Sequence, residues 1–229
     1  MMKVLAFDTS TKFLSIALLE DNEPKAVFHE DVGIRHSEIL VPTINDLLNK
    51  ISWDLKDIEL MCVGLGPGSF TGLRIAVATI KGFAAVLRNK VVGVPTMDAI
   101  AMNYSGEKKL IAPLLDARKG KVYSCIYERS GGEVKKTTDD LLITIDELLE
   151  NLDKKVMFFG DAVSKYSDKL DNNSFAGYDK NIDWYPRAVN IAHLGIKKSH
   201  SGADDPETID PLYLHAKECQ IRSMDGDKV

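Results

Sequence analysis

Cysteine is scarce in this sequence, which has 229 residues and three cysteines. Cys62, Cys125 and Cys219 lie far apart, their number is odd, and no CxxC pair occurs. A framework of disulfide bonds is therefore not expected, and this use of cysteine is typical of a reducing compartment.

An excess of positive charge is also missing, since the formal net charge is −5. A protein that binds nucleic acid by itself usually presents a basic face, so we expect any role on RNA to need a partner. The apolar run Val4–Phe7 near the N-terminus is too short for a signal peptide or a membrane span. We therefore expect a cytoplasmic protein without membrane contact, whose 45% apolar and 28% charged residues are ordinary for a globular fold.

Short apolar runs alternate with segments of helical periodicity along the chain. The first half predicts strands at Val4–Phe7, Phe13–Leu19, Ala26–Val32, Leu60–Val63 and Val91–Val94, and helices at Ser37–Ile51 and Phe70–Arg88. The second half predicts strands at Leu110–Leu115, Lys121–Glu128, Glu133–Thr138 and Val156–Phe159, and helices at Ile145–Leu152, Ala162–Leu170 and Ile191–His200. Such alternation predicts an α/β fold with a mostly parallel sheet and helices on its faces.

The two halves repeat one pattern. The first strand ends in Asp8 in one half and in Asp116 in the other, and a later strand ends in Gly64 or Gly160. We interpret this as a duplicated β-β-β-α-β-α unit, with the two units facing each other across a cleft. The predicted subdomains are residues 1–103, completed by 187–229, and residues 104–186.

The turn Asp8-Thr9-Ser10-Thr11 places an acid and three hydroxyls after a buried strand. Such a turn offers donors to a phosphate, and its carboxylate can hold hydrated Mg²⁺, but the same residues are also good turn formers. Both interpretations remain open. The predicted cleft set, which would line any nucleotide site, is Asp8, Thr9, Ser10, Gly66, Gly68, Asp116, Arg118 and Gly160.

The glycine-rich stretch Gly64–Gly82 follows none of the common phosphate or nucleophile motifs. No Lys-Ser/Thr follows the glycines, their spacing misses GxGxxG, and Ser69 lacks the glycines of GxSxG. A bare helix N-terminus stabilises an anion by about 0.3–1 kcal/mol, whereas micromolar binding needs about 8 kcal/mol. The loop cannot bind a nucleotide unaided, and its glycines suit a tight turn or close packing equally well.

The helix behind this loop is apolar nearly all round. Small residues recur at helical spacing, at Gly72 and Ala76 and again at Ala78, Gly82 and Ala85. A helix of this kind must be covered on more than one side, first by its own sheet. Its second cover is either the neighbouring helix, Ser37–Ile51, or another protein.

Catalytic and metal-binding residues are not predicted anywhere in the sequence. The five histidines make no HxxxH or HExxH spacing, and no Ser–His–Asp set can be recognised. Arg118, Lys119 and Lys121 form a small basic loop, which suits a solvated hairpin turn or an anion or RNA contact.

Five stretches together resemble the bacterial TsaB family, also called YeaZ: "VLAFDTSTKFLSIALLE", "HSEILVPTI", "GLGPGSFTGLRIAVATIKGFA", "GVPTMDAIA" and "LDARKGKVY". The resemblance implies a duplicated fold of the actin-like, Hsp70-like ATPase (ASKHA) class. It also implies a non-catalytic subunit that pairs with TsaD, and with the ATPase TsaE, to place threonylcarbamoyl on N6 of adenosine 37 in tRNAs reading codons that start with A. This chain would then need no cofactor, ATP and Mg²⁺ would serve the partner subunits, and tRNA would be met only through the complex.

The family dimerises through two helices, which match Ser37–Asn49 and Phe70–Leu87 here. The resemblance therefore implies a partner interface of Ser37, Leu40, Ile44, Leu48, Phe70, Gly72, Leu73, Arg74, Ala76, Val77 and Ile80. A homodimer through the same surface and a self-sufficient ATP-dependent phosphotransferase are the alternatives.

Three departures from the family patterns stand out. Ala76 replaces the last glycine of GLRIG, and the extra methyl is expected to loosen the contact helix; His215 replaces the arginine of YLR. The histidine pair that binds metal in TsaD has no counterpart, since His36 alone stands between Ile34 and Val41. Two ligands cannot come from one histidine, which argues against independent catalysis.

Overall fold

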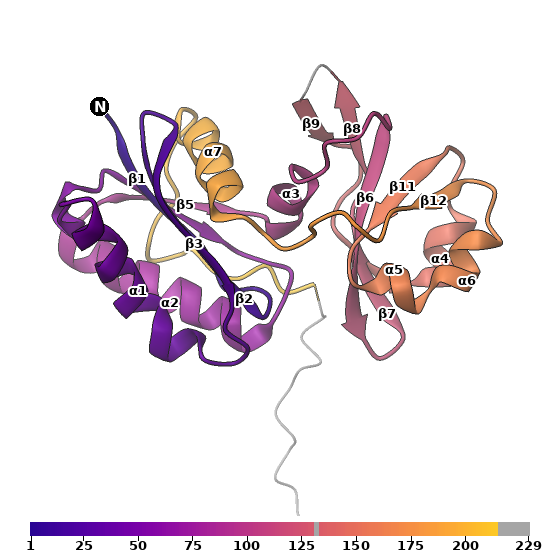
Figure 1. The fold of residues 1–229 in the computed structure, drawn as a ribbon, viewed down its shortest axis with the longest axis horizontal. Coiled ribbons are helices and arrows are strands. Elements are labelled where there is room, and N and C mark those ends of the chain that lie inside the picture. Colours follow the sequence, from indigo (N-terminus) through magenta and orange to yellow (C-terminus); the bar gives the residue numbers. More distant parts are fainter. Residues whose placement is uncertain (131–132, 215–229) are drawn as a thin grey trace, which may run out of the picture.

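The computed structural model describes residues 1–130 and 133–214, and it forms two lobes, each built around one β-sheet (Figure 1). The first sheet has the order β3-β2-β1-β4-β5. β4 and β5 run parallel to β1, and β2 is antiparallel to β1 and β3. Its strands are β1 (Lys3–Asp8), β2 (Phe13–Glu20), β3 (Glu23–Asp31), β4 (Leu60–Gly64) and β5 (Lys90–Val94).

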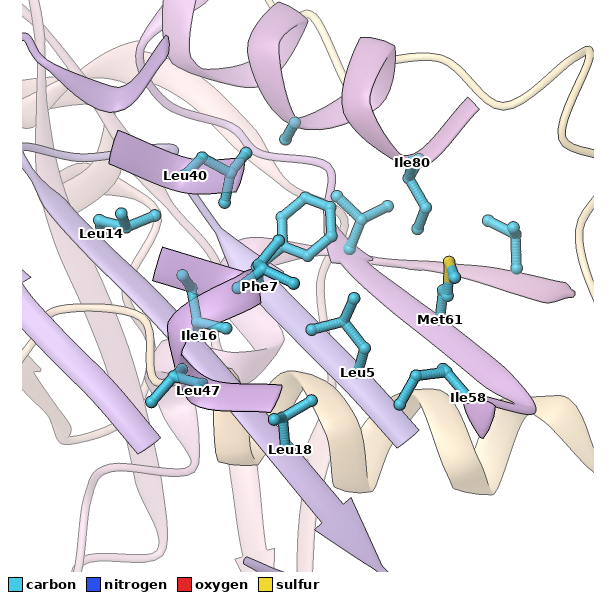
Figure 2. Close-up of a cluster of buried hydrophobic side chains, with 14 of the residues drawn as sticks. Leu5, Phe7, Leu14, Ile16, Leu18, Leu40, Leu47, Ile58, Met61 and Ile80 are labelled. Atoms are coloured by element: carbon cyan, nitrogen blue, oxygen red, sulfur yellow. The ribbon is translucent and has the colours of Figure 1, made fainter. Parts of the chain in front are cut away.

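Helices cover both faces of the first sheet because its central strands are apolar on both sides. Successive side chains of a strand point to opposite faces. Leu5 and Phe7 of β1 thus pack under α1 (His36–Lys50) and α2 (Phe70–Leu87), beside a short 3₁₀ helix at Leu55–Asp57 (Figure 2). Val4 and Ala6 face the opposite side, where α7 (Ala188–Ser199) covers them.

The second sheet repeats this strand order, as β10-β7-β6-β11-β12 with a β8–β9 hairpin attached. β7 and β8 keep one register against β6, since Leu114 pairs with Ser124 and Ile111 with Tyr127. They therefore act as one interrupted strand, and β9 and β10 lie beside them as the next. Its strands are β6 (Leu110–Arg118), β7 (Lys121–Ser124), β8 (Tyr127–Ser130), β9 (Glu133–Lys136), β10 (Leu141–Thr144), β11 (Val156–Phe159) and β12 (Ala176–Tyr178).

The shared strand order confirms the predicted fold class, a duplicated α/β fold of the actin-like ATPase type. The details differ from the sequence prediction in the second lobe. The predicted strand Lys121–Glu128 is split into two, and the predicted helix Ala162–Leu170 is split at Tyr166. β10 and β12 are too short to show an apolar period and were not predicted. The helices of this lobe are α4 (Ile145–Glu150), α5 (Ala162–Lys165) and α6 (Ser167–Asp171).

The two lobes exchange helices. α3 (Thr96–Ala101) follows the last strand of the first sheet, yet its Met97 and Ile100 pack in a cluster with residues of the second sheet. α7 follows the second sheet, yet its Ile191 and Ala192 cover the first sheet. After α7 the chain runs along the first lobe as far as Leu212, whose N–H donates to the carbonyl of Leu65 at 2.8 Å.

Candidate functional site

The carboxylate of Asp8, at the end of β1, is fully buried and accepts three hydrogen bonds. Its Oδ1 accepts hydrogen bonds from the Ser10 N–H (2.7 Å) and the Ser10 hydroxyl (2.6 Å), and its Oδ2 accepts one from the Thr96 hydroxyl (2.9 Å). Burial raises the pKa of Asp8 above its ordinary value, although these hydrogen bonds act to lower it. Thr96, the first residue of α3, was not predicted as part of this site; its only sequence signal is a hydroxyl two residues after the buried strand β5.

The glycine-rich loop packs directly on the Asp8 turn. Ser69 N–H donates to the Ser10 carbonyl at 2.6 Å, and the Thr9 hydroxyl donates to the Gly72 carbonyl at 2.7 Å. A Cβ added at Gly68 would lie 2.4 Å from the Ser10 oxygen. The two loops are in backbone contact, so these residues do not fit a phosphate group between them, and the glycines serve close packing.

The second lobe places a different residue at the Asp8 position. Phe7 and Val63 are partners in the first lobe, so Asp8 and Gly64 are next to each other. In the second lobe Pro113 pairs with Phe159. Gly160 therefore lies beside Leu114, and a Cβ added there would meet the Leu114 backbone oxygen at 2.3 Å.

Leu114 also pairs with Ser124 as Asp8 pairs with Ser15. The predicted equivalence of Asp8 and Asp116 is therefore wrong by two residues. The reason is the longer β6–β7 hairpin, in which β6 runs on to Arg118.

Asp116 is engaged within its own lobe. Lys165 Nζ lies 3.0 Å from both of its carboxylate oxygens, and the Arg118 N–H donates to Oδ1 at 3.0 Å. Burial acts to raise the pKa of Asp116, but these donors outweigh it and hold the pKa below its ordinary value. Arg118 and Lys119 form the hairpin turn, both with positive φ. Within residues 1–130 and 133–214, no hydrogen bond or ion pair joins this group to Asp8.

Most of the predicted partner interface faces the protein's own core, and this prediction is corrected. Only Ser37, Phe70 and Arg74 of the set are exposed. An apolar helical period marks the side that covers the sheet, so the pattern selected the inward face. Ala76 is fully buried, and its methyl adds to this core rather than to a contact between proteins. The inward-facing residues are Leu40, Ile44, Leu48, Gly72, Leu73, Ala76, Val77 and Ile80.

The outer side of α1 and α2 carries exposed apolar and small residues. Val41 is 46% exposed, and Phe70 is 45% exposed. Ala78 and Gly82 lie one helical turn apart on α2, and both are exposed. We call the residues Ser37, Val41 and Asn45 of α1 with Phe70, Arg74, Ala78 and Gly82 of α2 the outer helix face.

The C-terminal segment holds one end of this face in place. The Arg74 guanidinium lies 3.8 Å from the Phe70 ring centre, and its Nε donates to the Tyr213 hydroxyl at 3.2 Å. Lys81 reaches the Glu207 carbonyl and the Asp210 carboxylate. Phe70 and Arg74 are thus preorganised at the start of α2. His215, the departure that follows Leu214, lies outside the described residues, as does Cys219.

Metal-binding geometry does not occur in the described part of the chain, where no group of three His, Cys, Asp or Glu residues could hold an ion. His36 is buried, and its Nε2 lies 3.3 Å from the Phe13 carbonyl. One cavity, of about 400 Å³, lies in the second lobe between Lys109 and Lys154. Another, of about 610 Å³, lies between the end of α2 and residues 203–207. Neither is lined by residues of the predicted cleft set.

By length and composition alone, α2 is apolar enough to cross a membrane. Its inner side is buried against the sheet, however, through residues such as Leu73, Ala76 and Ile80. The fold therefore accounts for the apolar residues on the inner side of α2.

Comparisons with known proteins agree with the resemblance seen in the sequence. The family model described as "TsaD: tRNA N6-adenosine threonylcarbamoyltransferase" matches residues 22–195. The tRNA threonylcarbamoyladenosine biosynthesis protein TsaB of Bacillus subtilis is 31% identical, over 99% of this chain and all of that protein. Its counterpart in Escherichia coli is 35% identical over 56% of each chain.

A solved structure shows the same arrangement of both lobes. YeaZ from Pseudomonas aeruginosa superposes with a TM-score of 0.80 at 26% identity, covering 93% of this chain and all of that one. Full-length identity, fold and motifs agree, and this chain belongs to the TsaB family of tRNA threonylcarbamoyladenosine biosynthesis proteins.

Proposed function

We propose that this chain is a non-catalytic subunit that takes part in tRNA threonylcarbamoyladenosine formation by docking TsaD on its outer helix face. TsaE would join the same assembly, and the product would be the modified adenosine 37 of tRNAs that read codons starting with A. The chain would act in the cytoplasm and meet tRNA only within the complex. ATP and Mg²⁺ would be handled by the partner subunits.

The outer helix face is the observation that carries this proposal. It combines exposed Phe70 and Val41 with Arg74, and aromatic residues and arginine are enriched among the side chains that contribute most to protein interfaces. No large side chain protrudes at Ala78 and Gly82, so a partner helix can approach this part of the surface closely. Among the described residues, no element of this chain covers Gly82, where an added Cβ would meet no atom within 4 Å.

A non-catalytic role is supported by the state of the Asp8 turn. In an ATPase of this fold class, a free carboxylate and free backbone donors would be needed for phosphate and Mg²⁺. Here the Asp8 carboxylate already accepts three hydrogen bonds from Ser10 and Thr96, and the Ser69 N–H is directed to the Ser10 carbonyl.

The docking proposal is tested by Gly82→Arg. The site is open, so the variant should fold, but it should place an unpaired charge in the interface. We expect the dissociation constant for TsaD from the same source, measured by calorimetry, to rise by about 100-fold or more. Ser164→Arg, an exposed helical position in the other lobe, is the matched control and should bind normally.

Binding of Gly82→Arg with unchanged affinity would contradict docking on this face. Reconstitution with TsaD, TsaE and tRNA then links docking to activity. Modification of the tRNA should be abolished when this chain is omitted and also when the Gly82→Arg variant replaces it. A homodimer would use the same face, so solution mass at several concentrations should be compared for wild type and Gly82→Arg.

A further inference from the structure

The six-residue helix α3 lies at the junction of the two lobes (Figure 1). All of its residues except Asp98 are buried. Ala99 packs in a cluster with the first sheet, whereas Met97 and Ile100 pack in a cluster with the second. Any change in the angle between the lobes must therefore move α3 relative to at least one of them.

Polar contacts hold α3 to the first lobe. The Thr96 hydroxyl accepts from the Gly66 N–H at 3.0 Å and donates to the Asp8 carboxylate at 2.9 Å. The side-chain amide of Asn190, on α7, donates to the Ala99 carbonyl at 3.0 Å. The helix is thus tied to the glycine-rich loop, to β1 and to α7.

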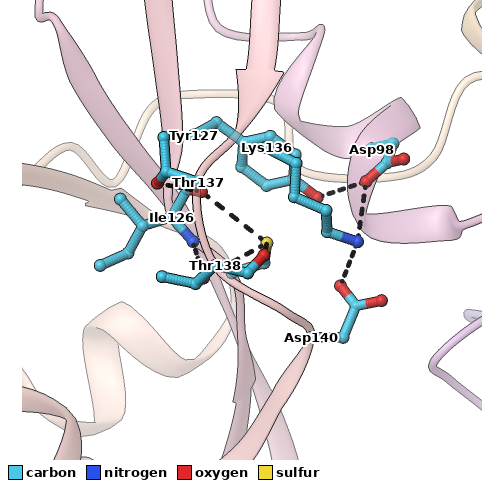
Figure 3. A network of polar contacts seen from close by, with 8 residues as sticks. Asp98, Ile126, Tyr127, Lys136, Thr137, Thr138 and Asp140 are labelled. Carbon is cyan, nitrogen blue, oxygen red and sulfur yellow. Dashed lines mark hydrogen bonds and ion pairs between the residues drawn. The ribbon is translucent and has the colours of Figure 1, made fainter.

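A second polar network holds α3 to the second lobe (Figure 3). The Tyr127 hydroxyl of β8 donates to Asp98 at 2.6 Å, and Lys136 Nζ of β9 lies 3.2 Å from the same carboxylate. Lys136 is also 2.9 Å from Asp140. Burial raises the pKa of Tyr127, so its hydroxyl keeps the proton that it donates.

The other chain crossing between the lobes, at residues 179–187, is also held. The Asn103 amide donates to the carbonyls of Asp183 (3.0 Å) and Tyr185 (2.8 Å). The Tyr185 ring stacks on Phe13 of β2 at 3.8 Å between centres and lies tilted against Trp184 at 4.0 Å. Trp184 in turn packs against the core between α3 and the second sheet.

We propose that these contacts form an interlobe lock, made by Thr96, Asp98, Tyr127 and Lys136, that fixes the two lobes at one angle. A change in the angle between the lobes would separate the buried Thr96 and Tyr127 hydroxyls, or the partly buried Asp98 and Lys136, from their partners. Leaving such groups unpaired is costly. The lobes then move as one rigid body, and the angle between them does not change when a nucleotide is added. This proposal concerns the isolated chain and is independent of the docking proposal.

The test measures the distance between the lobes directly. Spin labels are attached at Lys50→Cys on α1 and Asp168→Cys on α6, in a Cys219→Ser background, so the distance between the two labels reports the separation of the two lobes. Cys62 and Cys125 are buried and should stay unlabelled. We expect one narrow distribution that ATP with Mg²⁺ does not shift. The double variant Tyr127→Phe, Lys136→Met should broaden it and reduce amide-exchange protection of α3 by about tenfold or more.

Lys135→Met is the matched control, since Lys135 is the exposed neighbour of Lys136 on β9, and it should leave the distribution unchanged. Thr96→Val tests the first-lobe contacts separately if the double variant does not fold. A broad distribution in the wild type, a shift on adding ATP, or a folded lock variant with an unchanged distribution would overturn the proposal. TsaD binding by the lock variants should persist, which separates this result from the docking proposal.

Discussion

From the sequence, Asp8 is compatible with either cation binding or a structural role in a turn, whereas the structure supports the structural role. An aspartate after a buried strand is where an ATPase of this fold class would bind a cation. In this chain it organises the junction between the Asp8 turn, the glycine-rich loop and α3. Its raised pKa means that the folded protein holds the proton of Asp8 more tightly than the unfolded chain does.

The effect of replacing Asp8 by Asn on the free energy of unfolding should depend on pH, because burial raises the pKa of Asp8. The contribution of Asp8 to stability is present below its ordinary pKa of 3.8 and is lost as pH rises through the higher folded value. The Asn variant lacks this loss, so its free energy of unfolding relative to wild type should increase with pH across that window. Urea unfolding at a series of pH values measures it, and a relative stability that falls with pH would contradict the assignment.

At the scale of an element, the two sides of α2 have similar sequence patterns but different structural roles. Its inner side packs on the sheet through Gly72, Ala76 and Ile80, and its outer side carries Ala78 and Gly82. Both sides are apolar and both contain small residues at a spacing of four. Gly72 and Gly82 look alike in the sequence, but Gly72 is buried in close contact with the Asp8 turn and Gly82 is exposed to solvent.

Alanine substitutions at the two glycines should change stability in opposite directions. A Cβ at Gly72 would lie 1.9 Å from the Thr9 carbonyl oxygen, so Gly72→Ala should lower the free energy of unfolding by about 1–3 kcal/mol. Gly82→Ala has open space and should raise it by about 0.5–1 kcal/mol through helix propensity. Denaturant midpoints of both variants test this, and a stable Gly72→Ala would disprove the close contact.

At the scale of the whole molecule, the duplicated lobes are joined by the exchange of α3 and α7. This exchange places Thr96 beside Asp8 and Asp98 beside Tyr127, so the region that would hold a nucleotide in a working enzyme also holds the lobes together. The outer helix face, on which we propose that TsaD docks, lies on the far side of the first sheet from α7.

Calorimetry on the isolated chain tests whether the molecule retains an enzymatic function. Because the buried Asp8 carboxylate already accepts hydrogen bonds from Ser10 and Thr96, we expect no tight binding of ATP with Mg²⁺ and no turnover without TsaD. Micromolar binding with phosphate transfer would instead support the alternative of an independent phosphotransferase. Asp8→Asn serves as the control, since it should abolish any such transfer.

The sequence by itself determined the local elements of the first lobe, the duplication and the family. Apolar runs such as Val4–Phe7 and the helical period of Leu40, Ile44 and Leu48 depend on neighbours in the chain, and they were read correctly as elements. Quoted motifs such as "GPGSFTGLR" identified the family because they are specific strings.

Only the tertiary structure decided which surface is free and which residue of the second lobe occupies the place of Asp8. A helical period shows that a face is buried but does not say whether a sheet or a partner buries it, so Leu40 and Ala76 were assigned to the wrong contact. Strand register depends on pairing between distant segments, so Leu114, rather than Asp116, occupies the place of Asp8. The exchange of α3 and α7 has the same origin, because the sheet that a helix covers is chosen by packing between lobes.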